Sequence, residues 1–199
     1  MNLEKLFQMQ KELDDRILAE HPIQEGEDRL AKKILALQVE LGELANCWRG
    51  FKYWSYNQKP KTEELGECPL CKGTGDLGTV WAENCIECGG SGKVVVKNPL
   101  LEEYVDALHF ILSIGLDITD PELIELREID KAETITEQFI MIFDAVGELY
   151  EFEYEHWDYE SLLIKFVDLG EMLGFTWEQI EKAYLEKNKI NHERQESGY

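Results

Sequence analysis

Two pairs of acidic residues carry the clearest chemical signal in the sequence. Glu40 and Glu43 lie three residues apart in the segment VELGELA. Glu103 and Asp106 have the same spacing in EEYVDAL. Residues at this spacing share one face of a helix, and carboxylates among apolar neighbours are costly unless something neutralises them. If the two segments are facing helices, four carboxylates converge, and their hard oxygen atoms favour Mg²⁺ or Mn²⁺.

Two divalent metal ions held by such carboxylates could bridge phosphate oxygens and activate a water molecule. The acids therefore predict metal-dependent phosphate chemistry. The alternative is that they lie on exposed faces of amphipathic helices, which is common in a chain with 41 acidic residues. That alternative is weakened because VELGELA and YVDALHF are too apolar to leave a broad polar face.

A basic patch near the C-terminus offers a counterpart to these acids. Lys187, Asn191 and Arg194 are four and three residues apart, which places them on one helical face. Lysine and arginine suit phosphate groups, and asparagine adds a directed hydrogen bond. The other interpretation is that the cations stabilise the C-terminal end of a helix.

Aromatic residues follow the first acidic pair, and a histidine follows the second. A flat base could stack on Trp54 or its aromatic neighbours. His109, which comes one helical turn after Asp106, could hydrogen-bond the edge of that base. For Trp48 and Phe51 we favour packing in the core instead.

Four of the five cysteines form two C-x-x-C pairs with matching surroundings. Cys68 and Cys71, like Cys85 and Cys88, stand in the pattern C-x-x-C-x-G-x-G. In a reducing compartment such pairs bind metal, and four thiolates make a closed, structural zinc site whose tight turns need glycine. The pattern resembles half of the cysteine-rich region of DnaJ-type chaperones, but the His-Pro-Asp signature of a J-domain is absent from the sequence. We therefore predict a zinc-stapled loop, and we interpret Cys47 as a small core residue.

The overall charge excludes several classes of function. The 199-residue chain has 20 basic and 41 acidic residues, a formal net charge of −21. Such a surface repels nucleic-acid backbones and anionic membranes, so we expect neither as a partner. No apolar run approaches the length of a membrane span, and the N-terminus does not resemble a signal peptide. We therefore expect a cytoplasmic protein.

Helices must position most of these side chains. Apolar periodicity and capping patterns predict helices over residues 3–20, from near Asp28 to about Trp54, over 99–116, from near 135, over 158–173, and from near 177. Residues 56–97 differ, because they are rich in glycine, hold all the paired cysteines and have no helical period. A short strand is expected at Val94–Val96. We predict an all-α helical bundle built from 1–55 and 98–199, with 56–97 as a small zinc-stapled insertion.

Taken together, these segments resemble the all-α dimeric dUTPase family, which is related to the MazG-type nucleoside triphosphate pyrophosphatases. The resemblance is carried by ELGELAN at 40–46 with FKYWS at 51–55, EEYVDALHFILSIG at 102–115, KNKINHERQESGY at 187–199, and Gln10 and Asp14 in LFQMQKELD. These blocks span both ends of the chain. Residues 56–97 depart from the family pattern, which would have a shorter connection there.

The resemblance implies a Mg²⁺-dependent hydrolase that converts dUTP, and also dUDP, to dUMP. Two or more Mg²⁺ ions would be held by Glu40, Glu43, Glu103 and Asp106. Glu40 and Glu43 would be catalytic, and Glu43 would help hold the water that attacks the α-phosphorus. The other implied roles are phosphate binding by Lys187, Asn191, Arg194 and Lys52, uracil recognition by Gln10, Trp54 and His109, and closure of the site by Tyr199. The family also implies a homodimer whose sites form between subunits.

Three alternatives stay open at this point, and one of them is a redox-sensing enzyme whose thiols release zinc on oxidation. A related dCTP or broad-specificity nucleoside triphosphate pyrophosphatase would use the same metal site, because base choice depends on the orientation of a few donors and acceptors. A zinc-dependent adaptor without enzymatic activity would use the cysteine module to bind a partner protein and the helices as a scaffold. The acidic pairs and the basic tail would have no role in such an adaptor, so we favour the hydrolase.

Overall fold

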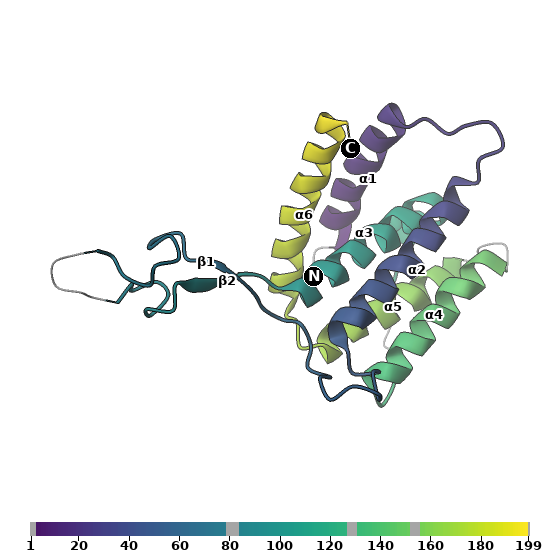
Figure 1. Ribbon diagram of the computed structural model, residues 1–199. Coiled ribbons are helices and arrows are strands. Elements are labelled where there is room, and N and C mark those ends of the chain that lie inside the picture. The colour runs from purple at the N-terminus through teal and green to yellow at the C-terminus, as the bar shows by residue number, and fades with distance from the viewer. Residues whose placement is uncertain (1–2, 79–83, 127–130, 152–155, 199) are drawn as a thin grey trace.

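Six α-helices and one two-stranded ribbon make up the described part of the chain. The computed structural model describes residues 3–78, 84–126, 131–151 and 156–198. The elements follow in the order α1 (Leu3–Glu20), α2 (Arg29–Trp48), β1 (Glu64–Glu67), β2 (Lys93–Lys97), α3 (Pro99–Ile118), the short 3₁₀ helix η1 (Pro121–Leu123), α4 (Ile135–Glu151), α5 (His156–Met172) and α6 (Trp177–Ser197). No helix in these ranges has the length and apolar character that a membrane span requires. The helices form a bundle from which the ribbon projects (Figure 1), so the predicted all-α fold with a small insertion is confirmed.

α3 is the central helix of the bundle because its sequence is apolar on most sides. It buries Leu108 and Ile111 completely or nearly so, and it contacts α1, α2, α5 and α6. α2 packs along it through buried residues such as Leu41. The two helices are antiparallel, because Lys33 near the start of α2 pairs with Asp117 near the end of α3 at 2.6 Å. The second half of α2 therefore lies beside the first half of α3, where the two acidic pairs are.

The remaining helices surround this central pair. α1 and α6 pack against each other and against α3, while α4 and α5 pack together beside α2 and α3 (Figure 1). Trp48 of α2 contacts Phe139 of α4 with ring centroids 5.4 Å apart, as the core interpretation of Trp48 predicted. Tyr104 of α3 stacks on Phe166 of α5 at 4.4 Å. Gly170 permits this approach, since a Cβ there would lie 2.6 Å from the Tyr104 hydroxyl oxygen.

The helix starts follow the predicted capping patterns. The Asn98 side chain accepts a hydrogen bond from the Leu101 N–H, and Pro99 occupies the first helical position of α3. Thr176 and Gln179 form a capping box at the start of α6. These contacts satisfy backbone donors that have no partner within the helix.

The predicted end of α2 near Trp54 is wrong, because the helix stops at Trp48. Arg49 takes the left-handed conformation with φ of 68°, which ends the helical hydrogen-bonding. The indole ring of Trp48 then lies over Gly50, where a Cβ would come within 2.3 Å of a ring carbon. Residues 51–55 therefore lie in irregular chain after the helix.

The insertion is an antiparallel ribbon with a cysteine-rich tip. β1 and β2 pair from Glu64 opposite Lys97 to Glu67 opposite Lys93, and the predicted strand at Val94–Val96 is confirmed within β2. The tip has its own small buried cluster of cysteines, which is separate from the bundle core. The insertion is thus attached to the bundle through its base.

Candidate active site

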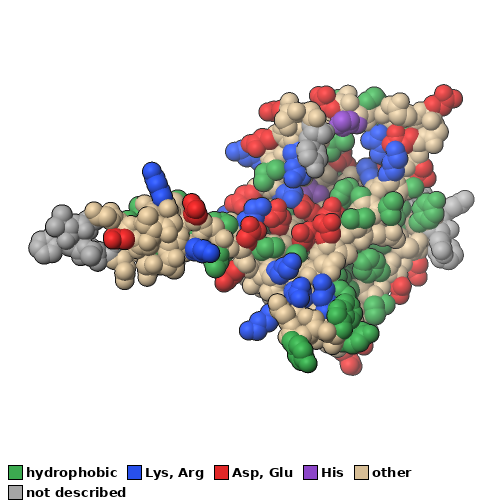
Figure 2. Space-filling model, viewed as in Figure 1, with side chains coloured by type: hydrophobic (Ala, Val, Ile, Leu, Met, Phe, Trp, Pro, Cys, Tyr) green, Lys and Arg blue, Asp and Glu red, His purple; other side chains and the backbone are tan. Residues whose placement is uncertain are grey.

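The predicted acidic pairs meet where the second half of α2 lies beside the first half of α3. One carboxylate oxygen from each of Glu40, Glu43 and Glu103 lies within 4.8 Å of the others. We call these three residues the carboxylate cluster. Glu43 is exposed, whereas Glu40 and Glu103 are half-buried. Figure 2 shows acidic side chains gathered over this part of the bundle.

Asp106, the fourth predicted metal ligand, lies one turn further along α3 in an ion pair. Its Oδ2 accepts a hydrogen bond from Lys187 Nζ of α6 at 2.6 Å. The same ammonium group lies 3.4 Å from Glu102 Oε1. Asp106 and Glu40 line one cavity. The structure therefore brings Asp106 close to the carboxylate cluster and gives it Lys187 as a partner.

Partial burial and crowding of charge make the cluster a favourable place for a cation. The pKa of Glu40 is raised to about 7, mainly by burial and to a lesser extent by repulsion from Asp106 and Glu43. The pKa of Glu103 is also raised to about 7, mainly by burial and to a lesser extent by repulsion from the neighbouring acids. The pKa of Asp106 is raised by burial, although the hydrogen bond from Lys187 opposes this. A divalent cation would relieve the repulsion, and a donor set made only of carboxylate oxygens fits Mg²⁺ or Mn²⁺.

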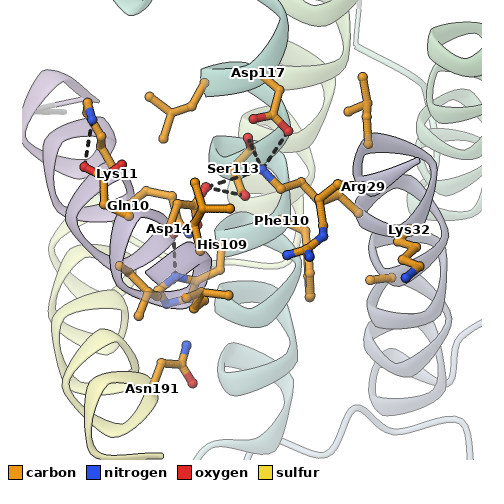
Figure 3. Close-up of a pocket in the computed structure, with 18 of the residues that line it drawn as sticks. Gln10, Lys11, Asp14, Arg29, Lys32, His109, Phe110, Ser113, Asp117 and Asn191 are labelled. Atoms are coloured by element: carbon orange, nitrogen blue, oxygen red, sulfur yellow. Dashed lines mark hydrogen bonds and ion pairs between the residues drawn. The ribbon is translucent and has the colours of Figure 1, made fainter. Parts of the chain in front are cut away.

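A cavity of about 1230 Å³ lies beside the cluster, between α1, α2, α3 and α6. Figure 3 shows this cavity between α1 and α2, with α3 behind it. Lys187, Asn191 and Arg194 all line it from α6, so the three predicted phosphate ligands on this helix share one face. Arg194 Nη1 lies 3.5 Å from Asn191 Oδ1. The cavity thus has acids on α2 and α3 and cations on α6.

Gln10 and His109, two of the three residues predicted to bind the base, touch each other in the cavity wall. Gln10 Oε1 lies 2.8 Å from His109 Nδ1 and 2.8 Å from the Tyr184 hydroxyl, and Gln10 Nε2 donates to Asp14 Oδ1 at 2.7 Å. Sequence reasoning gave no role to Asp14 or Tyr184. The four-residue spacing of Gln10 and Asp14 could have signalled their contact. Nothing in the sequence places Tyr184 beside a residue 174 positions away.

Two further predicted residues, Lys52 and Trp54, lie away from the cavity of their own chain. Trp54 is 65% exposed, and its ring contacts those of Phe51 and Tyr53. Lys52 Nζ lies 5.5 Å from the centre of the Phe51 ring. Neither Lys52 nor Trp54 lines the cavity. Tyr199, predicted to close the site, lies outside the described residues.

The four paired cysteines form a second candidate metal centre at the tip of the ribbon. Their sulfur atoms all lie within 4.8 Å of one another. The Sγ–Sγ distance is 3.7 Å between Cys68 and Cys85 and 3.8 Å between Cys71 and Cys88. Tetrahedral Zn–S bonds of about 2.3 Å separate sulfur atoms by about 3.8 Å, so the thiols fit a zinc ion. Four protein ligands fill such a site, which is typical of structural zinc.

The last glycine of each C-x-x-C-x-G-x-G motif shapes the two halves of this centre alike. Gly75 N–H donates to Cys71 Sγ, and Gly92 N–H donates to Cys88 Sγ, both at 3.2 Å. The φ angles of these glycines are +76° and +72°, and a Cβ on either would lie 2.3 Å from a carbonyl oxygen of the other half. Glycine is therefore required at both positions.

The sequence matches a model of a known family over most of its length. The model is described as dUTPase, and it covers residues 2–67 and 92–199, which omits the cysteine-rich tip. The covered residues include both acidic pairs and the cationic face of α6. No curated protein matches the chain significantly. The chain belongs to the all-α dUTPase family of enzymes.

Proposed function

We propose that this protein hydrolyses dUTP to dUMP and pyrophosphate in a Mg²⁺-dependent reaction, and that it also converts dUDP to dUMP and phosphate. The observation that carries the proposal is the carboxylate cluster beside a cavity that Lys187, Asn191 and Arg194 line from α6, side chains whose chemistry suits phosphate. A metal-bound triphosphate requires this combination of cation-binding acids and phosphate-binding cations. Membership of the dUTPase family supports a uracil nucleotide as the substrate.

The metal ligands that we propose are Glu40, Glu43, Glu103 and Asp106. Two or more Mg²⁺ ions bound there would neutralise phosphate charge and lower the pKa of a bound water. Glu43 is the exposed member of the cluster, so a water molecule reaches its carboxylate. We assign to Glu43 the orientation of the water that attacks the α-phosphorus, with Glu40 beside it as the second catalytic acid.

Lys187 is the central phosphate ligand of this proposal. Burial alone would lower the pKa of Lys187, but its pairing with Asp106 and Glu102 raises the pKa overall, so the ammonium group stays charged. Asn191 and Arg194 extend the same face of α6 along the cavity. Together these groups would stabilise the negative charge that develops on the departing pyrophosphate.

We further propose a homodimer in which a second copy completes each site. Lys52 and Trp54 lie outside the cavity of their own chain, and Trp54 is exposed. Residues 44–62 contain four basic residues and no acidic residue, so this segment is attracted to the acidic cluster of another copy. There Lys52 would bind phosphate and Trp54 would stack on the base, and Tyr199 would help close the site. Mixing inactive Glu43→Gln and Trp54→Ala proteins should then restore activity, whereas sites within one chain predict none.

The cysteine-rich tip is proposed to hold one structural zinc ion. Thiols at tetrahedral spacing support this assignment. Free thiols of this kind persist in a reducing compartment, which supports a cytoplasmic location. Metal analysis of the purified protein should find one zinc per chain, and its absence would remove the assignment.

The decisive experiment measures pyrophosphate release from dUTP, dCTP and dTTP with and without Mg²⁺. We expect selective, Mg²⁺-dependent turnover of dUTP. Glu43→Gln should reduce kcat by at least about 100-fold, whereas Glu148→Gln, in the matching Gly-Glu-Leu sequence of α4, should not. Turnover of dCTP or of many bases would keep the hydrolase and remove the uracil assignment. Turnover of no nucleotide would remove the hydrolase and favour the zinc-dependent adaptor.

A further inference from the structure

Lys187 of α6 lies between two acids of α3, the helix against which α6 packs (Figure 1). Its Nζ donates to Asp106 Oδ2 at 2.6 Å and lies 3.4 Å from Glu102 Oε1. The Lys187 side chain is only 11% exposed, whereas that of Glu102 is 37% exposed. An ammonium group in such a part-buried position needs an acidic partner, because little water is left to solvate its charge. We call Lys187, Asp106 and Glu102 the ammonium triad.

The spacing of the acids on α3 explains why Asp106 belongs to two groups. Asp106 follows Glu103 by three residues and Glu102 by four, so it shares a helical face with each of them. Glu103 meets the acids of α2 in the carboxylate cluster, whereas Glu102 lies beside Lys187 on the α6 side. Asp106 therefore stands between the carboxylate cluster and the Lys187 ammonium group.

Glu102 lies between two ammonium groups. Its Oε1 faces Lys187, and its Oε2 lies 3.6 Å from Lys97 Nζ at the end of β2. The two ion pairs orient the carboxylate, with one oxygen toward each ammonium group. Glu102 is thus held beside Lys187, although it is not one of the proposed metal ligands.

Asp106 cannot serve Lys187 and a divalent cation equally well. A cation bound to Asp106 would repel the Lys187 ammonium group and weaken its attraction to that carboxylate. Glu40 also attracts Lys187, but it too is a proposed metal ligand. Glu102 has no such role, so its carboxylate is free to pair with the ammonium group when Asp106 turns to a cation.

We propose that Glu102 is a positioning residue that takes over the Lys187 ammonium group when Asp106 binds a divalent cation, so that cation binding leaves no part-buried charge unpaired. Lys187 lines the cavity, so an ammonium group kept there is in place for a phosphate group of the nucleotide. Lys97 connects this triad to the end of the ribbon. The inference rests on the proposed metal site of the hydrolase and adds the acid that makes Asp106 available to it.

A double-mutant cycle tests the proposal with Mg²⁺ alone as the probe. Titration calorimetry without nucleotide or chelator measures the dissociation constant of Mg²⁺. Glu102→Gln should weaken Mg²⁺ binding by about tenfold, because the displaced ammonium group then has no acid to pair with. In a Lys187→Met background the same change should weaken binding by no more than about threefold, the size expected from the loss of an exposed charge.

The cycle separates positioning from the charge of Glu102. If Glu102 acted through its charge alone, its replacement would cause equal losses in both backgrounds, and this result would overturn the proposal. Lys187→Met alone should strengthen Mg²⁺ binding by at least about threefold, because it removes the competitor for Asp106. Weaker binding in Lys187→Met would show that the ammonium group does not compete, which would also overturn the proposal. Glu148→Gln, which removes an exposed charge from α4, is the control and should change Mg²⁺ binding by less than about twofold.

Nitrogen NMR follows the ammonium group directly and needs neither turnover nor the Lys187 variant. Ammonium protons that are held by an acid exchange with water slowly enough to be observed. With Mg²⁺ bound, the Lys187 ammonium signal should persist in the wild type and be lost in Glu102→Gln. A signal that persists equally in both proteins would overturn the proposal, even if Lys187→Met does not fold.

These readouts distinguish failure of the inference from failure of the proposed function. Equal losses of Mg²⁺ affinity in the two backgrounds would remove the role of Glu102 and leave the metal site and the hydrolase in place. If the wild type bound no Mg²⁺ and hydrolysed no nucleotide, the proposed function would fail, and the inference would fail with it.

Discussion

Replacing Glu43 with glutamine should stabilise the protein in the absence of Mg²⁺ and remove its response to Mg²⁺. Glu43 shares the carboxylate cluster with Glu40 and Glu103, whose oxygens lie within 4.8 Å of its own. The substitution keeps the volume of the side chain and removes one of three negative charges. Metal-free stability should rise because repulsion is relieved, while metal binding and activity should fall because a ligand is lost.

Coulomb's law sets the size of this effect. Two unit charges 4.8 Å apart repel by about 0.9 kcal/mol in water and by about 3.5 kcal/mol at an effective dielectric constant of about 20. Glu43 is exposed, so solvent screens its interactions and the lower value applies to each neighbour. The gain in the free energy of unfolding should be about 1–2 kcal/mol, which corresponds to a rise in Tm of about 2–8 °C for a chain of this size.

Thermal melts followed by circular dichroism at about pH 8 measure this change. The buffer is depleted of Mg²⁺ without a chelator, so that zinc stays bound. Glu148→Gln changes the net charge equally at an exposed site on α4 and serves as the control. Saturating Mg²⁺ should raise the Tm of the wild type and the control but not of Glu43→Gln. At about pH 5 the gain should vanish, because Glu40 and Glu103, with pKa values of about 7, are then protonated.

Two results would refute this reasoning. A Glu43→Gln protein less stable than the wild type without Mg²⁺ would mean that the three acids do not repel one another. A Glu43→Gln protein with the wild-type response to Mg²⁺ would mean that the ion binds elsewhere.

Three further predictions concern pH, the Lys187 ion pair and zinc. The pKa values of Glu40 and Glu103 in the folded protein are about 7, above the reference value of 4.5. The stability that these two groups contribute is therefore fully present below about pH 4.5 and is lost as the pH rises to about 7. The free energy of unfolding without Mg²⁺ should fall across this window by about 1–2 kcal/mol per group after allowance for solvent screening, and a flat profile would contradict the shifts. Lys187→Met leaves the part-buried Asp106 unpaired and should lower the free energy of unfolding, measured by urea denaturation, by about 2–4 kcal/mol. Adding Asp106→Asn should restore most of this stability but not the activity. A double variant as unstable as Lys187→Met alone would argue against the ion pair. Cys68→Ser should abolish zinc binding, as measured by metal analysis, and should leave the helical circular dichroism signal unchanged. The reason is that the tip has a buried cluster separate from the bundle core. Loss of the helical signal would show that the bundle depends on zinc.

Local sequence was sufficient to predict the bundle and both candidate metal centres. α3 is apolar on most sides, and its cap at Asn98 is set by neighbouring residues, so a short window of sequence contains the information. The spacing of Glu40 and Glu43 likewise places both on one helical face, and the cysteine spacing defines the thiol centre. In each of these cases the interacting groups belong to one element or to a short repeat.

Contacts between distant segments could not be predicted in this way. The packing of α6 on α3 gives Asp106 a partner, Lys187, that lies 81 positions away. Tyr184 reaches Gln10 through the same packing. The end of α2 was missed for a local reason, because periodicity does not register the left-handed conformation of Arg49.

The base of the insertion explains how a ribbon with a cysteine-rich tip is accommodated beside the carboxylate cluster. Lys61 N–H donates to the Cys47 carbonyl oxygen at 2.9 Å, and the Lys61 carbonyl oxygen accepts from Leu100 N–H at 3.0 Å. These bonds join the end of α2 to the start of α3, each about one turn from an acidic pair. The family model matches the residues on both sides of this closure and omits residues 68–91, so we expect the bundle to depend on the closure rather than on the tip. The tip also has its own buried cluster of cysteines, which is separate from the bundle core.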